Sequence, residues 1–144
     1  MSATHSGLNF WGDVSIVPAA ARTTTTTGDA VDLGMNNGCV VWIATGAVTD
    51  GTYTVSLTEC ATVGGSYTAV AAADIIPGST GSGANGAVFD TTAAHDQAMF
   101  FFGYRGSMEF IKVVVTVSGT PSTGAVFAAG AMTYLPLHAP VSTP

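Results

Sequence analysis

The chain has 144 residues, the size of one folded domain, and only three basic against nine acidic side chains, for a net charge of −6. Charged residues make up 8% of the chain, about a third of the usual share, and the acidic balance excludes direct binding to DNA or RNA. No apolar run is long enough for a membrane-spanning helix, so no membrane partner is expected.

The first 28 residues have no strand pattern and are predicted to form an extended N-terminal arm. Residues 1–11 contain no basic residue and no apolar central segment, so they do not match a secretory signal peptide. Two aromatic side chains in the arm, Phe10 and Trp11, are unfavourable to leave in water. We therefore expect them to contact a partner or the body of the domain.

Residues 29–135 are predicted to form an all-β domain, because runs of Thr, Val and aromatic residues alternate with Gly and Pro turns. The clearest strand covers residues 52–60, where apolar and Thr or Ser positions alternate with a period of two. The Thr and Ser side chains of this strand are expected to face water. The domain class predicted is an antiparallel β-sandwich of jelly-roll type.

A second strand, residues 39–44, is apolar at every position and includes Trp42. Such a strand lies either in the centre of a sandwich or with its outer side against another subunit. The turn dipeptide Asp50-Gly51 follows it, which predicts that it pairs with the strand at residues 52–60 as an antiparallel neighbour.

The rest of the domain continues as strands and turns. The predicted elements are a strand at 67–72, a closing turn at 74–78, a glycine-rich loop at 78–86, strands at 98–104 and 110–117 joined by a hairpin at 105–107, and a last strand at 125–135. Cys39 and Cys60 are too few and too far apart for a disulfide framework or a zinc knuckle, so both are predicted to be small buried side chains.

A C-terminal tail, residues 136–144, contains three prolines and no strand pattern. No Asp, Glu, Lys or Arg occurs from residue 113 to residue 144, although a free surface usually carries interspersed charges. Leu135, Leu137 and His138 are therefore candidate protein-interface residues, together with Phe10, Trp11 and Trp42.

Few residues indicate catalysis or metal binding. His5, His95 and His138 lie in no recognisable catalytic motif, so an enzyme is not expected. Four residues could supply oxygen ligands for calcium: Asp29, Asp32, Asn36 and Asn37. Turn formation explains these residues equally well. No metal or cofactor is therefore expected.

Aromatic residues offer a different functional class. On a sandwich they could form a flat face that stacks on sugar rings, as in carbohydrate-binding modules; they are Trp11, Trp42, Tyr53, Tyr67, Tyr104 and Tyr134. Tyr53 shares its face with Val55 and Leu57, which favours the core for that side chain. For Trp42 both a core position and a place on a sugar-stacking face stay open.

Several segments, taken in order, resemble a family of small capsid-associated virion proteins of tailed phages. These segments span residues 38–141 and are the "ATG..TDGTYTV" strand at 44–55, the "GSYTAV" strand at 65–70, the "GYRGS" hairpin at 103–107 and the "HAPV" tail at 138–141. Relatives would carry a basic strand after the hairpin, whereas this chain has Met108-Glu109-Phe110-Ile111-Lys112 there.

The resemblance implies a non-enzymatic β-sandwich that decorates or cements the capsid by bridging adjacent major capsid protein subunits. The scarcity of charge agrees with a surface that other proteins cover, since interface cores are depleted of charge. Capsid symmetry favours a homo-trimer at local three-fold positions. The alternatives are another structural head or tail component, and a carbohydrate-binding sandwich on the virion that aids host adhesion.

Overall fold

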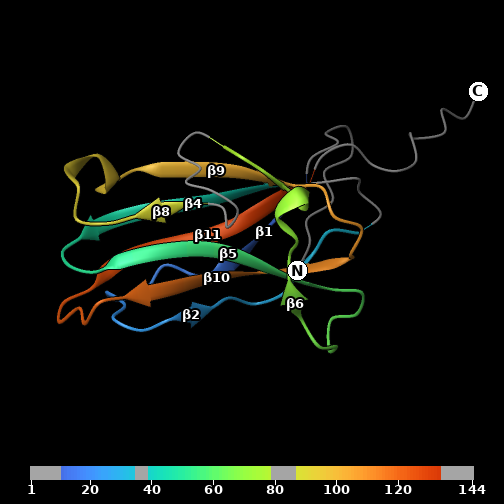
Figure 1. Cartoon of the computed structure of the whole chain (residues 1–144), viewed down its shortest axis with the longest axis horizontal. Coiled ribbons are helices and arrows are strands. Elements are labelled where there is room, and N and C mark those ends of the chain that lie inside the picture. Colours follow the sequence, from blue (N-terminus) through green and yellow to red (C-terminus); the bar gives the residue numbers. More distant parts are fainter. Residues whose placement is uncertain (1–10, 35–38, 79–86, 134–144) are drawn as a thin grey trace, which may run out of the picture.

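A computed structural model describes residues 11–34, 39–78 and 87–133 and shows an all-β fold of two antiparallel sheets packed against each other (Figure 1). Sheet A has the strand order β1 (Trp11–Ile16), β11 (Ala125–Thr133), β4 (Cys39–Val48), β9 (Met99–Tyr104) and β7 (Ile75–Ile76). The β-sandwich predicted from the sequence is confirmed, while a jelly-roll topology stays a prediction.

Sheet B is built around the long antiparallel pair β5 and β10. Its strands are β2 (Thr26–Thr27), β10 (Phe110–Ser118), β5 (Thr52–Cys60) and β6 (Thr68–Ala69), with β3 (Val31–Asp32) beside β10 and β8 (Val88–Phe89) beside β5. The helices in the described ranges are the short 3-10 turns η1 (Ala72–Asp74) and η3 (Ala93–His95). In those ranges no helix has the length and hydropathy to span a bilayer.

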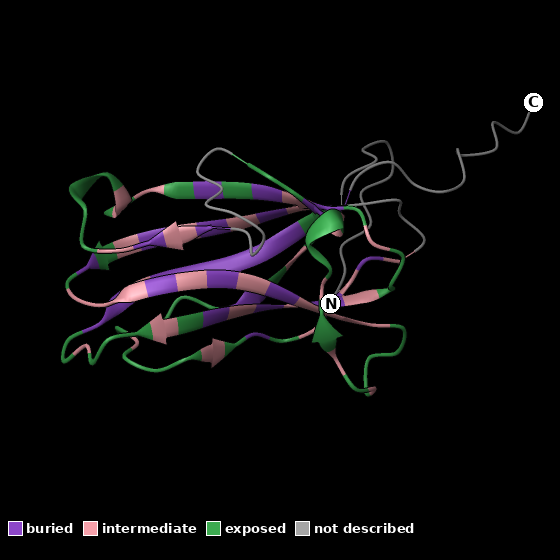
Figure 2. Ribbon diagram, viewed as in Figure 1, coloured by how far each residue is buried: buried purple, intermediate pink, exposed green. Residues whose placement is uncertain are grey.

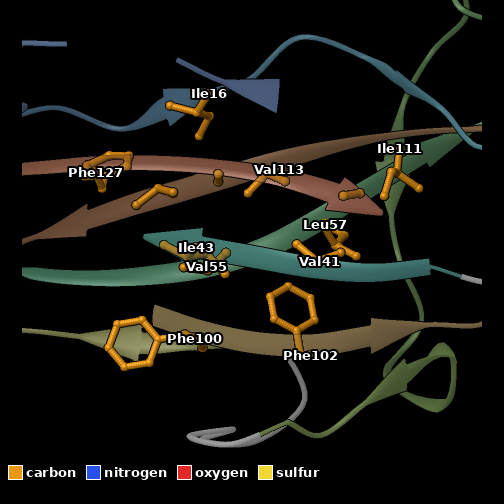
Figure 3. Packing of buried hydrophobic residues seen from close by; sticks show 14 of the residues in the cluster. Ile16, Val41, Ile43, Val55, Leu57, Phe100, Phe102, Ile111, Val113 and Phe127 are labelled. Carbon is orange, nitrogen blue, oxygen red and sulfur yellow. The ribbon is translucent and has the colours of Figure 1, made fainter. Parts of the chain in front are cut away.

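The core lies between the two sheets, and strand alternation determines which side chains enter it. Figure 2 shows this alternation as buried and less buried bands along β5 and β9. Figure 3 shows side chains of both sheets meeting in the core, with Ile43 and Phe100 from sheet A and Val55 from sheet B. The ring of Tyr53 stacks on Phe89 with 4.9 Å between centroids, as part of an aromatic cluster at one end of the core.

Two hairpins predicted from the sequence are wrong. The turn at Asp50-Gly51 does not join neighbouring strands, because β4 belongs to sheet A and β5 to sheet B. Likewise β9 and β10 lie in different sheets, so the connection through residues 105–107 also crosses the sandwich. The predicted turn at residues 74–78 contains a short strand, β7, which pairs with β9.

The Asp50 carboxylate links two chain connections that lie at one end of the sandwich. It accepts hydrogen bonds from the backbone N–H groups of Ser122, Thr123 and Gly124, with 2.7 Å from Ser122 N to Oδ2. These bonds, led by the one from Gly124, lower the pKa of Asp50 below its ordinary value. The carboxylate thus ties the β4–β5 connection to the β10–β11 connection.

We expect the hydrogen bonds of Asp50 to contribute less to stability in acid. Because the pKa of Asp50 is lower in the folded state, its contribution to stability is present above about pH 4 and is lost as pH falls through the folded pKa. The variant Asp50→Asn should melt below the wild type at neutral pH, and the difference should narrow below about pH 4. Thermal unfolding at a series of pH values measures this, and a pH-independent difference would contradict it.

The N-terminal arm predicted over residues 1–28 is wrong for the part that the structure describes. Residues 11–16 form β1 at the edge of sheet A, and β2 lies within sheet B. The Ser15 hydroxyl donates to the Asp29 carbonyl oxygen at 2.7 Å and accepts from the Val113 N–H at 3.2 Å. The sandwich therefore begins by Trp11 rather than at residue 29; the predicted tail at 136–144 lies outside the described residues.

The two cysteines are free and differ in exposure. Cys39 is buried as predicted, and burial raises the pKa of its thiol to about 12. Cys60, at the end of β5, is only half-buried, so the prediction of a buried side chain is wrong there. Cys60 occupies an outward position of β5, two residues after Thr58, so its side chain lies on the outer side of sheet B and not in the core.

Because the thiolate is the reactive form, a thiol reagent at about pH 8 should modify Cys60 well before Cys39 in the folded protein. Both should react after denaturation. Peptide mass spectrometry over a time course measures the two rates, and Cys60→Ser should abolish the fast phase. Equal rates in the folded state would contradict the burial of Cys39.

Candidate protein interface

The outer side of sheet A is almost entirely apolar. Along each strand, the residues between the core positions point away from sheet B. We call these outward residues the apolar face; they are Gly12, Val14, Val40, Trp42, Ala44, Gly46, Ile76, Met99, Phe101, Gly103, Val126, Ala128, Gly130 and Met132.

Trp42 lies in the central row of this face. The strand register places it opposite Gly130 on β11 and opposite Phe101 on β9, while Val14 of β1 lies beyond Gly130. Trp42 is half-buried and Phe101 is 36% exposed. Trp42 is thus neither a core residue nor freely exposed, because neighbouring strands of its own sheet cover part of it.

Glycines leave room for the large side chains to lie flat. A Cβ on Gly130 would lie 2.7 Å from Cζ2 of Trp42, so the indole crosses the place where that side chain would be. In the same way Ile76 lies against Gly103 and Met132 against Gly12, with 3.0 Å to a Cβ placed on each glycine. The large side chains of the apolar face therefore lie close against the sheet, and the face is nearly flat apart from a shallow hollow beside Trp42.

The apolar face carries no charged side chain. Among the residues of the five strands of sheet A, only Asp13 is charged, and its partner in the register is Ala131, a core residue. Met99 and Met132 are nevertheless 55% and 42% exposed. A contiguous exposed apolar area of this kind is commonly a binding surface.

The outer side of sheet B has a different character. The outward residues of β5 are Thr52, Thr54, Ser56, Thr58 and Cys60, which confirms that the Thr and Ser positions of this strand lie away from the core. On β10, Lys112 places its Nζ 4.3 Å from the ring centroid of Tyr67. Sheet B therefore presents hydroxyl groups and a cation between apolar side chains such as Val88, Phe110 and Val114, whereas the outer side of sheet A presents hydrocarbon alone.

The structure places the predicted interface residues as follows. Trp42 lies on the apolar face, and Trp11 is the first residue of β1. Phe10, Leu135, Leu137 and His138 lie outside the described residues, so their roles stay predictions.

The predicted sugar-stacking face does not assemble from the described tyrosines. Tyr53 and Tyr104 are buried in the core, and Tyr67 lies on the sheet B side. Tyr134 lies outside the described residues. Beside Trp42 there is a shallow hollow of about 240 Å³, lined by this residue with Gly12, Asp13, Val14 and Met132. Sugar sites need several placed polar groups, and Asp13 is the one polar residue among those that line this hollow.

Two aspartates away from the apolar face, Asp90 and Asp32, have structural partners. His95 Nδ1 lies 2.8 Å from Asp90 Oδ1, and hydrogen bonds from Thr92, followed by the one with His95, lower the pKa of Asp90 to about 2. Asp32 Oδ1 accepts from the Gly34 N–H at 2.7 Å, which is turn chemistry. Within the described ranges, no three His, Cys, Asp or Glu side chains are grouped to hold a metal ion.

Sequence reasoning missed most of the apolar face. Val14 was assigned to an arm and Ile76 to a turn, so neither edge strand of sheet A was expected. The run Met99-Phe100-Phe101-Phe102 does indicate an apolar outer side of the sheet. Bulky apolar residues at consecutive strand positions must occupy both sides of a sheet.

Comparison with protein-family models finds no match for the sequence, and a search of curated proteins finds no similar sequence.

Proposed function

We propose that this protein is a structural virion component that cements or decorates a tailed-phage capsid by bridging adjacent major capsid protein subunits. The observation that carries the proposal is the unequal character of the two outer surfaces. The five-stranded sheet turns an uncharged hydrocarbon face outward, and the other sheet turns outward a mixed surface in which the Thr and Ser row of β5 and Lys112 of β10 lie among apolar side chains. This division suits a subunit with one side buried in an assembly and the other in water.

The fold also supports a role in bridging. Trp11 and Thr133 are paired neighbours on β1 and β11, so the segments 1–10 and 134–144 connect to the sandwich side by side. These segments include the predicted interface residues Phe10, Leu135, Leu137 and His138. Contacts made by both segments would therefore start from one end of sheet A, where they could reach a capsid subunit together.

Binding to capsid shells tests the proposal. Purified protein should bind expanded shells of the parent phage in a fixed ratio to the major capsid protein, and shells that carry it should withstand higher temperature than bare shells. A variant that lacks residues 134–144 should bind more weakly. Lack of binding to expanded shells, or equal heat resistance with and without the protein, would overturn the proposal.

A glycan array tests the alternative function, carbohydrate binding. If the protein bound sugars through the hollow beside Trp42, a glycan array would show selective binding that Trp42→Ala abolishes. Selective, Trp42-dependent binding together with absence from the capsid lattice would favour adhesion over cementing.

A further inference from the structure

We propose that the apolar face of sheet A binds the same face of a second copy of this chain, so that two sandwiches pack back to back around a two-fold axis. This inference does not depend on the virion assignment, because it follows from the shape and chemistry of the face alone. It assigns the hydrocarbon surface to self-association and leaves the ends of the chain for other partners.

The area of the face is sufficient for a specific contact. Strands lie about 4.8 Å apart and rise about 3.4 Å per residue, so five strands over about six residues cover roughly 500 Å². Two such faces would bury roughly 1,000 Å² in total, which is the lower bound for a specific protein interface. The face alone thus predicts a reversible dimer rather than a permanent one.

The charge distribution favours this face over any other surface for self-contact. Each copy carries a net charge of −6, so two copies repel wherever their acidic residues approach. The apolar face contains no charge, and Asp13 at its edge bonds to its own strand, accepting from the Val14 N–H at 2.8 Å. Packing through this face keeps the acidic residues of the two copies out of the contact.

The flatness of the apolar face also suits packing against a second sheet. Because Trp42, Ile76 and Met132 lie across glycines of neighbouring strands, the surface is flat enough for another sheet to approach at the usual distance of about 10 Å. Met99 and Met132 are flexible enough to fill the remaining gaps. A sheet of the same kind is the partner whose surface matches this flatness.

Pairing at the free edge of β1 is a weaker route to association. The Val14 N–H is bonded to Asp13, and the Ser15 carbonyl oxygen accepts from the Asp29 N–H at 2.7 Å. These backbone groups are therefore not available to an added strand. Association through the face uses identical patches and closes as a pair, whereas a trimer needs two different patches on each copy.

Sedimentation equilibrium of the full chain over a range of concentrations tests the proposal. The wild type should be a reversible dimer, and Met132→Lys should weaken the dimer by at least about tenfold, because the contact would bury a lysine from each copy. Met99→Lys should act in the same direction. The matched control is Met108→Lys, a methionine of similar exposure, 38% against 42% for Met132, that lies in the β9–β10 connection.

Thermal unfolding and circular dichroism of each variant show whether the fold is kept. A folded Met132→Lys monomer beside a dimeric Met108→Lys supports the proposal. A monomeric wild type, a trimer, or a dimer that both face substitutions leave unchanged would overturn it. Binding of the same samples to capsid shells is measured separately, so loss of the dimer and loss of the proposed function are distinguishable.

Discussion

Replacing Tyr53 by Ala is expected to lower the free energy of unfolding by about 3–5 kcal/mol, the largest effect of any single substitution discussed for this fold. Tyr53 has no exposed surface, and its ring stacks on Phe89 and packs against Phe127, with 5.8 Å between the latter centroids. It comes from sheet B, while Phe127 comes from sheet A. Its removal would leave a cavity where the two sheets meet.

The matched control, Tyr53→Phe, keeps the ring and removes only the hydroxyl. That hydroxyl lies 3.0 Å from the Arg22 carbonyl oxygen and 3.1 Å from that of Asp50, so the expected loss is about 1 kcal/mol. Chemical denaturation of the two variants gives both values. If Tyr53→Phe cost as much as Tyr53→Ala, the hydroxyl and not the ring packing would be the main contribution.

Ser15→Ala should lower the free energy of unfolding by about 2–3 kcal/mol, which is large for the loss of one oxygen atom. The hydroxyl bonds both the Asp29 carbonyl oxygen and the Val113 N–H, and Ser15 itself is buried. Alanine would leave these two backbone groups without this partner, and an unsatisfied buried polar group costs about 1–3 kcal/mol.

Ser56→Ala is the control for this effect. Its side chain is half-buried on the outer side of sheet B, and its hydroxyl lies 3.5 Å from the Val114 carbonyl oxygen. We expect a change within about 0.5 kcal/mol, as for most surface substitutions. Denaturation of the two variants side by side measures the difference, and equal losses would show that Ser15 does not link β1 to sheet B.

The strands were predictable where a local pattern determines them. The strand at residues 52–60 has the predicted bounds, because one side faces the core and the other faces away from it, and this produces strict alternation. The partners of the strands were not predictable in the same way. A tight turn reverses the chain both in a hairpin and at a corner between sheets, and only distant bonds such as those of Asp50 to residues 122–124 distinguish the two.

The candidate interface was only partly predictable for a related reason. Trp42 was singled out because every position of its strand is apolar, which is a local property. The joining of Trp42, Phe101, Met132 and Val14 into one surface depends on the order β1-β11-β4-β9, which brings together the two ends of the described chain. Single strand patterns contain no information about that order.

The absence of charge from the apolar face has a consequence for the rate at which it meets a partner. Without electrostatic steering, and with a net charge of −6 on each copy, two copies should associate through this face at no more than about 10⁵–10⁶ M⁻¹s⁻¹, and added salt should speed this association by screening their repulsion. Sulfate should strengthen the contact, since salts excluded from protein surfaces favour apolar burial. An assembly held together in this way would keep its strength from dilute to concentrated salt, where a contact made of ion pairs would weaken.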